Sequence, residues 1–600
     1  MTDAPDPFDA RRALRAPPAL APFNAAGVLD AADVHVGARL AALAEADDPL
    51  VALAAAFAAR GPRLGHVHVD LATVRDTAVA DLEEPVDLSE LPWPEPGPWL
   101  ERLGASGLAG DDGPLRLDGT RIYLDRYWRE ERQIAADLTA LAGPADVREE
   151  PLEGGLARLF AGGDERQRQA AAAAVRRRLS VIAGGPGTGK TTTVARIVAL
   201  LVEQAAAAGT PAPMVALAAP TGKAADRLRR AVGNEGAQLD VAEPTRALLR
   251  GLEAVTLHRL LGRRRGSSSR FRHHRGNRLP HDVVVVDETS MVSLTMMARL
   301  VEAVRPGARL VLVGDPGQLA SIEAGAVLAD VVGPAATGEP ASPGAPLAEG
   351  VVVLDRVHRF GAGIAALAEA VRAGDADRAI DVLEAAPEGV AWVRGDATAA
   401  LRGPAVAAGR ELHAAAVAGD GPRALAALGG FRLLCANRRG PAGVASWQEQ
   451  VEAWLTAAVP GFSALERWYL GRPLLVTAND YGLRLFNGDT GVVVTGPDGR
   501  AAAVFERGGE VDALSPSRLE AVETVHAMTI HKSQGSQFAT AAVVLPDPGS
   551  RLLTRELLYT AITRAREQLV LVGSEEAVRA GIDRPIARAS GLRELLWGGA

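Results

Sequence analysis

Lysine is rare in this chain, and its three positions mark segments that could do chemistry. Of the 65 Lys and Arg residues only three are lysines: Lys190, Lys223 and Lys532. Lysine offers a compact, flexible ammonium, whereas arginine offers a rigid planar fork. A site that keeps lysine in an arginine-rich chain needs the small cation, and all three lysines stand in short polar segments that contain glycine. This pattern indicates a protein that handles nucleotides.

A glycine-rich run ending at Lys190 has the spacing of a phosphate-binding loop. Backbone N–H groups of such a loop, and of the helix that follows it, bind phosphate oxygens. We expect Lys190 to reach the β- and γ-phosphates of ATP and the Thr191 hydroxyl to bind Mg²⁺. The apolar run at 181–182 and the helical stretch at 192–201 supply the strand and helix that the loop requires. The predicted loop residues are Gly184, Gly185, Pro186, Gly187, Thr188, Gly189, Lys190, Thr191 and Thr192.

Two adjacent acids follow the β-branched run at 283–286, which reads as a buried strand. Asp287 would hold Mg²⁺ through water, and Glu288 would orient or deprotonate the attacking water. The plainer interpretation is a helix cap, to which Thr289 and Ser290 could also contribute. The upstream phosphate-binding loop favours the catalytic interpretation.

Three further residues could sense or stabilise the γ-phosphate. Gln318 follows a third apolar run, at 310–313, and could report whether that phosphate is present, although a turn amide is the plainer role. Transition-state charge requires planar, bidentate donors. Arg359 and Arg564 are candidates, but composition alone cannot select them, because surface ion pairing is the usual role of arginine.

The elements that must position these residues form an α/β pattern. Between about 161 and 350, short β-branched runs alternate with helical stretches, which predicts a parallel sheet covered on both faces. Residues 333–350 are rich in Pro, Gly and Ala and resemble a linker. A second α/β unit follows at 351–575. Within it, the Asn487-Gly488 and Asp498-Gly499 turns predict an inserted small β-barrel over about 470–525.

The two ends of the chain carry no catalytic signature. Residues 1–150 are rich in Ala and Leu, with a helix expected over 50–60 and a strand over 121–124. We expect a helical N-terminal domain that docks on a partner. Residues 576–600 form the predicted C-terminal tail.

Composition limits the partners and the compartment. The net charge of −8 excludes a uniformly basic, nucleic-acid-coating protein, so any DNA contact requires a local patch. The segment 263–282 provides one, with seven arginines and Phe271, unless it is only a solvated loop. The single cysteine, Cys435, cannot form an internal disulfide, which favours a reducing cytoplasm. With no apolar run of 18 residues, we expect no membrane span.

The motifs, taken in order, resemble superfamily 1 helicases and more narrowly the RecD-like group. The resemblance covers about 165–575. The matching segments are Gln167, 184–192 (GGPGTGKTT), 219–225 (APTGKAA), 256–262 (TLHRLLG), 285–292 (VVDETSMV), 313–319 (VGDPGQL), 358–360 (HRF), 527–536 (AMTIHKSQGS) and 559–566 (YTAITRAR).

This resemblance implies two RecA-like motor domains that hydrolyse ATP to move along single-stranded DNA. It implies that Gln167 contacts adenine, that Gln318 couples the γ-phosphate, and that Arg359 and Arg564 are fingers from the second domain. It also implies a duplex-splitting hairpin at 263–282 and 5′-to-3′ movement, a direction that no residue shows by itself. Turn hydroxyls and buried histidines remain alternative roles for the implied DNA contacts, which are Thr221, Gly222, Thr256, His258, Phe271, Asn437, Thr529 and His531.

The RecD-like family contains subunits of a helicase–nuclease complex and longer stand-alone helicases with helix-hairpin-helix regions. Residues 65–71 and 121–131 resemble the subunit branch. That branch implies a heterotrimer with RecB and RecC acting on duplex-end DNA in double-strand break repair and homologous recombination. All three lysines lie in motor motifs, so we expect the nuclease site in another chain. A stand-alone helicase and a nucleotide-switched binding module remain the alternatives, and Gln537 departs from the family's acidic residue.

Overall fold

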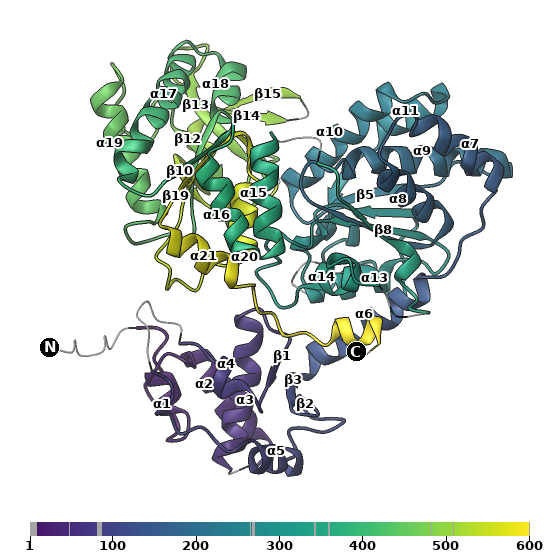
Figure 1. Cartoon of the computed structure of the whole chain (residues 1–600), viewed down its shortest axis with the longest axis vertical. Coiled ribbons are helices and arrows are strands. Elements are labelled where there is room, and N and C mark those ends of the chain that lie inside the picture. Colours follow the sequence, from purple (N-terminus) through teal and green to yellow (C-terminus); the bar gives the residue numbers. More distant parts are fainter. Residues whose placement is uncertain are drawn as a thin grey trace.

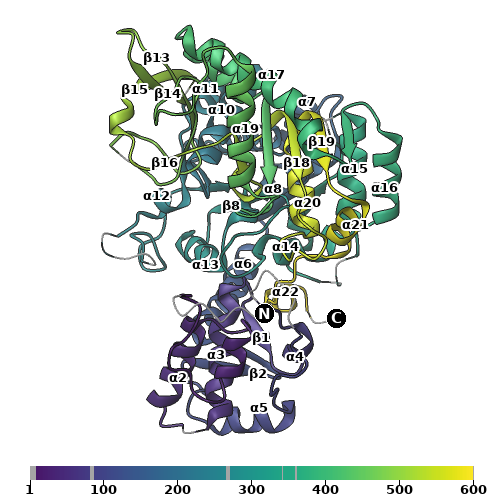
Figure 2. The ribbon, with the colours of Figure 1, turned by 90° about the vertical axis from the view of Figure 1, so that its left-hand side faces the viewer.

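The computed structural model describes residues 9–46, 48–80, 87–264, 266, 270–340, 342, 344–357, 361–480, 482–507 and 509–598. Two α/β lobes lie side by side above a smaller N-terminal domain (Figures 1 and 2). Arg359, one of the two predicted fingers, lies outside the described residues.

The N-terminal domain packs five helices on a three-stranded antiparallel sheet of order β1-β3-β2. The rings of Phe23 and Trp99 meet Phe57 edge-on, with centroids 5.8 and 6.0 Å apart, and form the centre of its core. The helix predicted over 50–60 and the strand predicted over 121–124 are confirmed. The elements are α1 (Ala21–Ala25), α2 (Ala31–Leu43), α3 (Pro49–Arg63), β1 (His68–Asp70), α4 (Val74–Thr77), α5 (Pro96–Ala105), β2 (Leu115–Asp118) and β3 (Arg121–Leu124).

Helix α6 (Asp125–Leu141) joins this domain to the first lobe. Its buried residues Ile134 and Leu138 belong to the core of the first lobe, where α6 packs against α13 (Leu294–Ala303). The N-terminal domain is therefore attached to the first lobe by a shared apolar core as well as by the chain.

The first lobe is a six-stranded parallel sheet of order β6-β5-β7-β8-β4-β9. The four valines of β7 are fully buried, as a sheet covered on both faces requires. Strand β9 pairs with β4, so the first lobe extends beyond the boundary predicted at residue 350. The strands are β4 (Leu179–Gly184), β5 (Val215–Ala219), β6 (Ala254–Thr256), β7 (Val283–Val286), β8 (Arg309–Gly314) and β9 (Val351–Leu354). The other helices are α7 (Glu149–Leu159), α8 (Glu165–Arg176), α9 (Lys190–Ala208), α10 (Gly222–Gln238), α11 (Glu243–Gly251), α12 (Leu257–Leu261) and α14 (Val327–Val332).

The second lobe is a five-stranded parallel sheet of order β10-β19-β18-β11-β17. Its strands are β10 (Val390–Val393), β11 (Phe431–Cys435), β17 (Ala527–Thr529), β18 (Phe538–Val544) and β19 (Ala565–Val572). Its helices are α15 (Ala362–Ala373), α16 (Ala376–Ala385), α17 (Ala397–Val417), α18 (Gly421–Leu428), α19 (Val444–Ala458), α20 (Arg555–Ile562) and α21 (Glu575–Asp583).

A strand-rich insertion interrupts the second lobe where the hairpin turns predicted it. Five antiparallel strands form a sheet of order β15-β14-β13-β12-β16, with Gly499 at φ +76° in the turn between β13 and β14. In the described part of the chain no pairing joins β15 to β16, so the insertion is an open sheet where we expected a barrel. The strands are β12 (Pro473–Val476), β13 (Thr490–Thr495), β14 (Ala501–Arg507), β15 (Glu510–Leu514) and β16 (Val522–Thr524).

The C-terminal segment is part of the folded body. It leaves the second lobe and crosses to the other two domains, where it forms α22 (Leu592–Trp597) beside α6 and α14 (Figure 1, yellow). Val67 N–H donates to Ala589 O at 2.8 Å, and Trp597 Nε1 donates to Asp330 O at 2.9 Å. The segment predicted as a tail therefore ties all three domains together.

One helix of the described residues is long and apolar enough to cross a membrane by length and composition. This is α9, half of which is buried, and it lies in the core of the first lobe directly after the phosphate-binding loop.

Candidate nucleotide site and inter-lobe cleft

Three neighbouring strands of the first lobe deliver the predicted nucleotide residues to one place. Strands β7, β8 and β4 are adjacent and parallel, so their carboxyl ends meet at the same sheet edge. Asp287, Asp315 and the glycine-rich loop follow these three ends. The strand–loop–helix context predicted for the loop is confirmed by β4 and α9.

The loop is closely packed around its glycines. Gln167 Nε2 donates to Thr188 O at 3.0 Å, which fixes the loop against α8. Gly189 has φ +80°, and a Cβ there would collide with the Gln167 amide, so glycine is required. Lys190 Nζ donates to Gly184 O at 2.5 Å and to Gly185 O at 2.8 Å. Burial lowers the pKa of Lys190, and this ammonium lies over the loop where phosphate oxygens would be bound.

The acid pair is buried and held by an arginine. Asp287 is 3% exposed, and its Oδ2 has no hydrogen-bond partner, as expected of an oxygen available to a cation. Glu288 adopts φ +52°, a left-handed conformation that costs energy for a residue with a Cβ. Arg227 on α10 forms an ion pair with Glu288, and its Nη2 lies 3.7 Å from Asp287 Oδ2.

The charges of this pair are set by burial and by Arg227. Burial and the neighbouring Glu288 raise the pKa of Asp287. Burial alone would also raise the pKa of Glu288, but Arg227 outweighs it and lowers that pKa. The helix-cap alternative fails, because no side chain caps the 3₁₀ turn Thr289–Met291 that follows Glu288. The residues fit a site for a divalent cation and a water molecule.

Gln318 occupies the third strand end, as predicted. Its Nε2 donates to Asp315 Oδ2 at 2.9 Å, and Gly317 N–H donates to Asp315 Oδ1 at 3.0 Å. The next residue, Leu319, contacts the second lobe, because its backbone N–H donates to Thr560 Oγ1 at 3.0 Å. Gln318 therefore lies between an acid of the nucleotide site and the other lobe.

The second lobe adds Arg564 and Tyr559 to this site. Arg564 is 2% exposed, and its guanidinium donates to Thr560 O at 2.9 Å and to Ser536 O at 3.1 Å. Burial lowers its pKa to about 10, while the charges of Glu288 and Asp315 act in the opposite direction. A Cβ at Gly185 would lie 2.8 Å from the Tyr559 hydroxyl, so this residue reaches the phosphate-binding loop.

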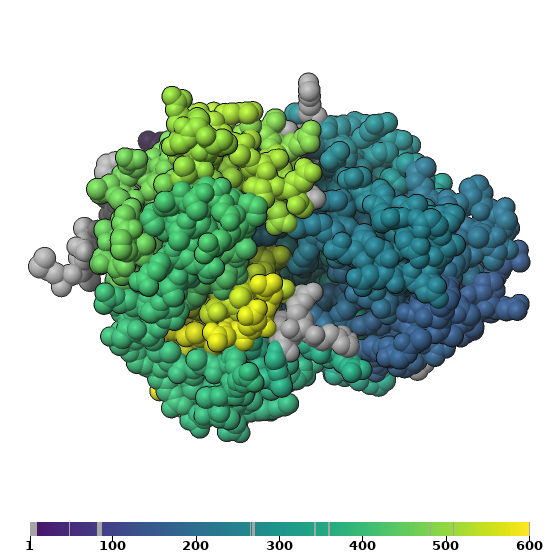
Figure 3. Space-filling view, turned by 90° about the horizontal axis from the view of Figure 1, so that it is seen from above, coloured from purple at the N-terminus to yellow at the C-terminus, as the bar shows by residue number. Residues whose placement is uncertain are grey.

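A cavity of about 320 Å³ opens between the two lobes beside the glycine-rich loop. Its lining comes from the glycine-rich loop and Asp315 of the first lobe and from Arg372 and Tyr559 of the second. From above, the two lobes meet along a depression (Figure 3). The nucleotide site therefore spans both lobes.

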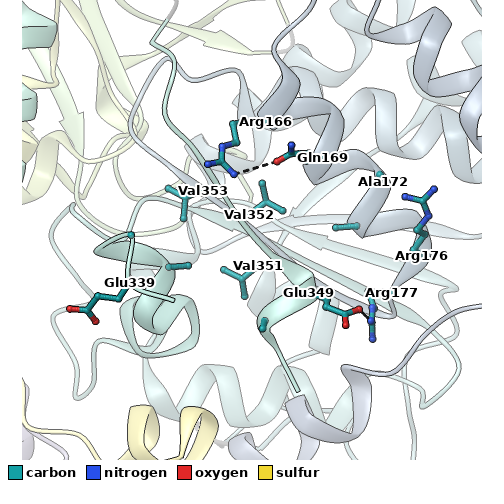
Figure 4. Close-up of a pocket in the computed structure, with 14 residues that line it drawn as sticks. Arg166, Gln169, Ala172, Arg176, Arg177, Glu339, Glu349, Val351, Val352 and Val353 are labelled. Atoms are coloured by element: carbon teal, nitrogen blue, oxygen red, sulfur yellow. Dashed lines mark hydrogen bonds and ion pairs between the residues drawn. The ribbon is translucent and has the colours of Figure 1, made fainter. Parts of the chain in front are cut away.

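A second hollow, of about 540 Å³, lies on the outer face of the first lobe between α8 and β9 (Figure 4). Its cations already have partners. Arg166 donates to Gln169 Oε1 at 3.3 Å, Arg177 pairs with Glu349, and Arg176 Nη2 lies 2.6 Å from Glu149 Oε2. The described arginines of this hollow are therefore already paired, whereas the 320 Å³ cavity is lined by the glycine-rich loop.

The residues predicted to contact DNA form two groups at strand ends. Ala219 pairs with Thr256 across β5 and β6, which places Thr221 beside Thr256 at one edge of the first lobe. Cys435 pairs with Thr529 across β11 and β17 in the second lobe. Four other members, Gly222, His258, Asn437 and His531, lie within three residues of these ends.

Several of these side chains also have structural roles. The Thr221 and Thr256 hydroxyls accept N–H groups of α10 and α12 at 3.2 and 3.3 Å. Thr529 is buried and accepts Lys532 N–H at 3.2 Å. Burial lowers the pKa of both His531 and His258, although the His258 residue keeps an exposed surface. Both the turn-hydroxyl role and phosphate contact remain compatible with this geometry.

Phe271 is not placed to contact DNA. It is 5% exposed, belongs to the core of the first lobe and lies 5.8 Å from the His258 ring. In the described part of 263–282, bridges join Arg263 to Phe271 and His274 to Asn277, and Arg275 Nη2 lies 2.7 Å from Asp137 Oδ2. The ring anchors the base of this segment because burial of an aromatic side chain is strongly favourable.

A larger cleft, of about 770 Å³, separates α10 from the insertion and from residues 535–538. Lys223 Nζ donates to Ser536 Oγ at 2.8 Å across it, and Arg230 pairs with Glu506. We call this space the inter-lobe cleft.

Sequence reasoning gave no role to Arg227 or Tyr559. Both lie in segments that were matched as motifs or follow one directly, and Arg227 comes four residues after Lys223, on the same helix face. That spacing was the available signal. Their contacts join residues hundreds of positions apart, which no local pattern reports.

Two parallel-sheet lobes, a phosphate-binding loop in the first and a buried arginine from the second define the class of two-lobed P-loop ATPase motors. Residues 167–324 match the family profile described as an AAA domain, and residues 524–572 match that of a UvrD-like helicase C-terminal domain. Residues 25–123 match the N-terminal domain of RecBCD enzyme subunit RecD.

The chain is 55% identical over 571 residues to RecBCD enzyme subunit RecD of Mycolicibacterium smegmatis, covering 95% of this chain and 98% of that protein. It is 52% identical over 579 residues to the same subunit of Mycobacterium tuberculosis, covering 95% of each. The ATP-dependent RecD2 DNA helicase of Deinococcus radiodurans is 31% identical over 370 residues, which cover 60% of this chain and 43% of that helicase. The chain belongs to the RecD family of RecBCD enzyme subunits.

Proposed function

We propose that this protein is an ATP-dependent DNA helicase subunit of a RecBCD-type complex, and that it moves 5′-to-3′ along single-stranded DNA. The observation that carries this proposal is the position of Arg564. This cation of the second lobe is buried within the electrostatic reach of Glu288 and Asp315 in the first. Hydrolysis in a site built by two lobes links the state of the nucleotide to the relative position of the lobes.

The side chains assign the chemical roles. Lys190 and the loop N–H groups would bind the phosphates, and Gln167, which donates to Thr188 O of the loop, would contact the adenine. Glu288 orients the attacking water and accepts its proton, while Arg564 stabilises charge that develops on the γ-phosphate. Gln318 conveys the γ-phosphate state through Asp315 and Leu319. Bound Mg²⁺, held by Thr191 and Asp287, would neutralise phosphate charge.

DNA is proposed to cross the carboxyl edges of both sheets. Thr221, Gly222, Thr256 and His258 would touch it from the first lobe, and Asn437, Thr529 and His531 from the second. Hydroxyl, amide and imidazole groups suit phosphate contacts, which hold a strand without reading its sequence. Relative movement of the two groups would then advance the protein along the strand.

The partners follow from the family. We propose a heterotrimer with RecB and RecC in the cytoplasm, acting on duplex ends in double-strand break repair and homologous recombination. The N-terminal domain, with its own core, is proposed to dock on a partner subunit, and the nuclease site is assigned to another chain. The match of the N-terminal domain to the RecD profile favours the subunit over the stand-alone helicase.

Two measurements test this proposal. Steady-state ATP hydrolysis should rise when single-stranded DNA is added, both for the chain and for its complex with RecB and RecC in which any ATPase activity of the partners is inactivated. Co-purification with RecB and RecC should yield a stable heterotrimer. A chain that unwinds DNA alone and binds neither subunit would be a stand-alone helicase, and hydrolysis indifferent to DNA would leave only a nucleotide-switched module.

A further inference from the structure

Arg227 contacts both lobes at once. One guanidinium nitrogen pairs with Glu288 in the nucleotide site, and the other, Nη1, donates to Gly535 O of the second lobe at 3.2 Å. The side chain is half-buried on α10, whose first turn carries Thr221 and Gly222. A single residue therefore joins the water-orienting acid to the opposite lobe.

The segment that Arg227 touches is a meeting point of cations. Lys223 Nζ donates to Ser536 Oγ at 2.8 Å, and Arg564 Nη1 donates to Ser536 O at 3.1 Å. Lys223 and Arg227 are one helical turn apart on α10, so both point the same way. Gly535 and Ser536 thus receive two cations from the first lobe and one from the second.

The same segment continues directly from the proposed DNA contacts. Strand β17 ends at Thr529, His531 opens the 3₁₀ turn His531–Ser533, and Gly535 follows with φ +71°. A DNA strand that displaced this turn would move the carbonyl oxygen to which Arg227 donates. The displacement would reach Glu288, because one rigid planar group makes both contacts.

The backbone conformation of Glu288 makes its carboxylate sensitive to a movement of Arg227. Its left-handed conformation is costly and persists only when its surroundings hold it. The ion pair with Arg227 is the contact that holds its carboxylate. Release or re-aiming of Arg227 therefore changes the orientation of the group that positions water.

We propose that Arg227 is a positioning residue that couples DNA contact at the Gly535–Ser536 turn to the orientation of Glu288 in the nucleotide site. It touches neither the phosphates nor the DNA in this assignment. Its role is to make hydrolysis depend on DNA. This inference rests on the proposed function and adds the residue that links its two halves.

The test compares three variants in the assembled complex, with any ATPase activity of the partner subunits inactivated. Arg227→Gln removes both contacts, and Arg227→Lys keeps a cation that can reach only one partner at a time. Arg250→Gln is the matched control, because Arg250 is an exposed ion-paired arginine on neighbouring α11. For each we measure kcat and KM for ATP with and without single-stranded DNA, and the affinity for a fluorescent nucleotide.

We expect Arg227→Gln to lower DNA-stimulated kcat roughly 10- to 100-fold, the effect of losing a charged hydrogen bond. KM and nucleotide affinity should stay within a few-fold, and the ratio of stimulated to basal kcat should fall towards one. Arg227→Lys should restore part of kcat but only a fraction of the ratio. Arg250→Gln should behave as wild type.

An unchanged ratio in Arg227→Gln, or a raised KM with normal kcat, overturns the inference. If the glutamine variant melts before assay temperature, the lysine variant decides alone, and a wild-type ratio in it is equally decisive against the inference. A wild-type complex that shows no DNA stimulation contradicts the proposed function instead. The two failures are therefore distinguishable.

Discussion

The two lobes share one architecture but divide the chemistry unequally. The first lobe places the phosphate-binding loop, the acid pair and Gln318 at adjacent strand ends, so its half of the site is complete within one sheet. The second lobe contributes Tyr559 from α20 and Arg564, which follows the end of that helix. It also contributes the turn at Gly535, next to Ser536, whose carbonyl oxygen accepts from Arg564. We therefore propose that the first lobe binds the nucleotide, whereas the second lobe contributes the positive charge of Arg564 where the lobes meet.

The largest effect should come from removing the central cation of the first lobe. We expect Lys190→Gln to lower kcat for ATP hydrolysis by on the order of 10³ and to weaken nucleotide binding, because the half-buried ammonium lies over the phosphate-binding loop. Hydrolysis and fluorescent-nucleotide binding measure this. Arg250→Gln is the control, since Arg250 is exposed and pairs with Glu243 outside the site. Normal ATP hydrolysis in Lys190→Gln would show that the phosphate-binding loop of the first lobe is not the nucleotide site.

The second lobe should affect kcat without affecting binding. Arg564→Lys keeps a cation but loses the planar fork, so kcat should fall by roughly 10² while nucleotide affinity stays within a few-fold. Thermal melting checks the fold, because the guanidinium also bonds Thr560 O and Ser536 O. Equal loss of affinity and rate would show that both lobes bind, and the division described above would be wrong.

A third pair of changes distinguishes a residue that stabilises the first lobe from a residue proposed to contact DNA. Phe271→Ala should destabilise the lobe by about 3 kcal/mol, because the ring is buried in its core. The expected result is a lower Tm. His258→Ala, at the exposed neighbouring ring, should leave Tm unchanged and weaken binding to single-stranded DNA. A Phe271→Ala protein with normal Tm and weakened DNA binding would restore the original prediction for this residue.

The last effect depends on pH and concerns the segment that ties the domains together. Burial raises the pKa of Asp330 to about 7, and its Oδ2 has no hydrogen-bond partner. The folded state then binds more protons than the unfolded state, so stability falls as pH rises from about 4 through 7 and the loss is complete above it.

Asp330→Asn should remove that loss, which is roughly 4 kcal/mol at most. The variant should melt higher than wild type at pH 8 and nearly alike at pH 4.5. A wild-type protein with the same Tm at both values, or an Asn variant with a lower Tm at pH 8, would refute the assigned protonation.

The sequence predicted what local spacing determines. The loop from Gly184 to Thr192, the acid pair after β7 and Gln318 after β8 are short patterns at strand ends, and the structure brings them together. The strands of the insertion were predicted from turns, but their failure to close depends on strand pairing between distant residues. Phe271 was misassigned because an aromatic in a basic segment does not reveal whether it faces solvent or core.

Contacts between the lobes could not be predicted from patterns. Arg564 was selected only through resemblance, since many arginines share its local context. Arg227 reaches Gly535 across 308 positions, and Lys223 reaches Ser536 across 313. Such pairs depend on how two folded sheets dock, which no window of sequence encodes.

The central claim is that the state of the nucleotide sets the relative position of the two lobes. Cys435 is buried, and burial raises its pKa to about 12, so thiol dyes would react with introduced cysteines instead. Arg250→Cys in the first lobe and Asp377→Cys in the second place one dye on each, and energy transfer between them reports their separation. We predict that energy transfer changes when ATP and Mg²⁺ bind and returns to its starting value after hydrolysis. In Arg564→Lys we expect neither change. Transfer that stays constant while ATP is bound and hydrolysed would contradict the account.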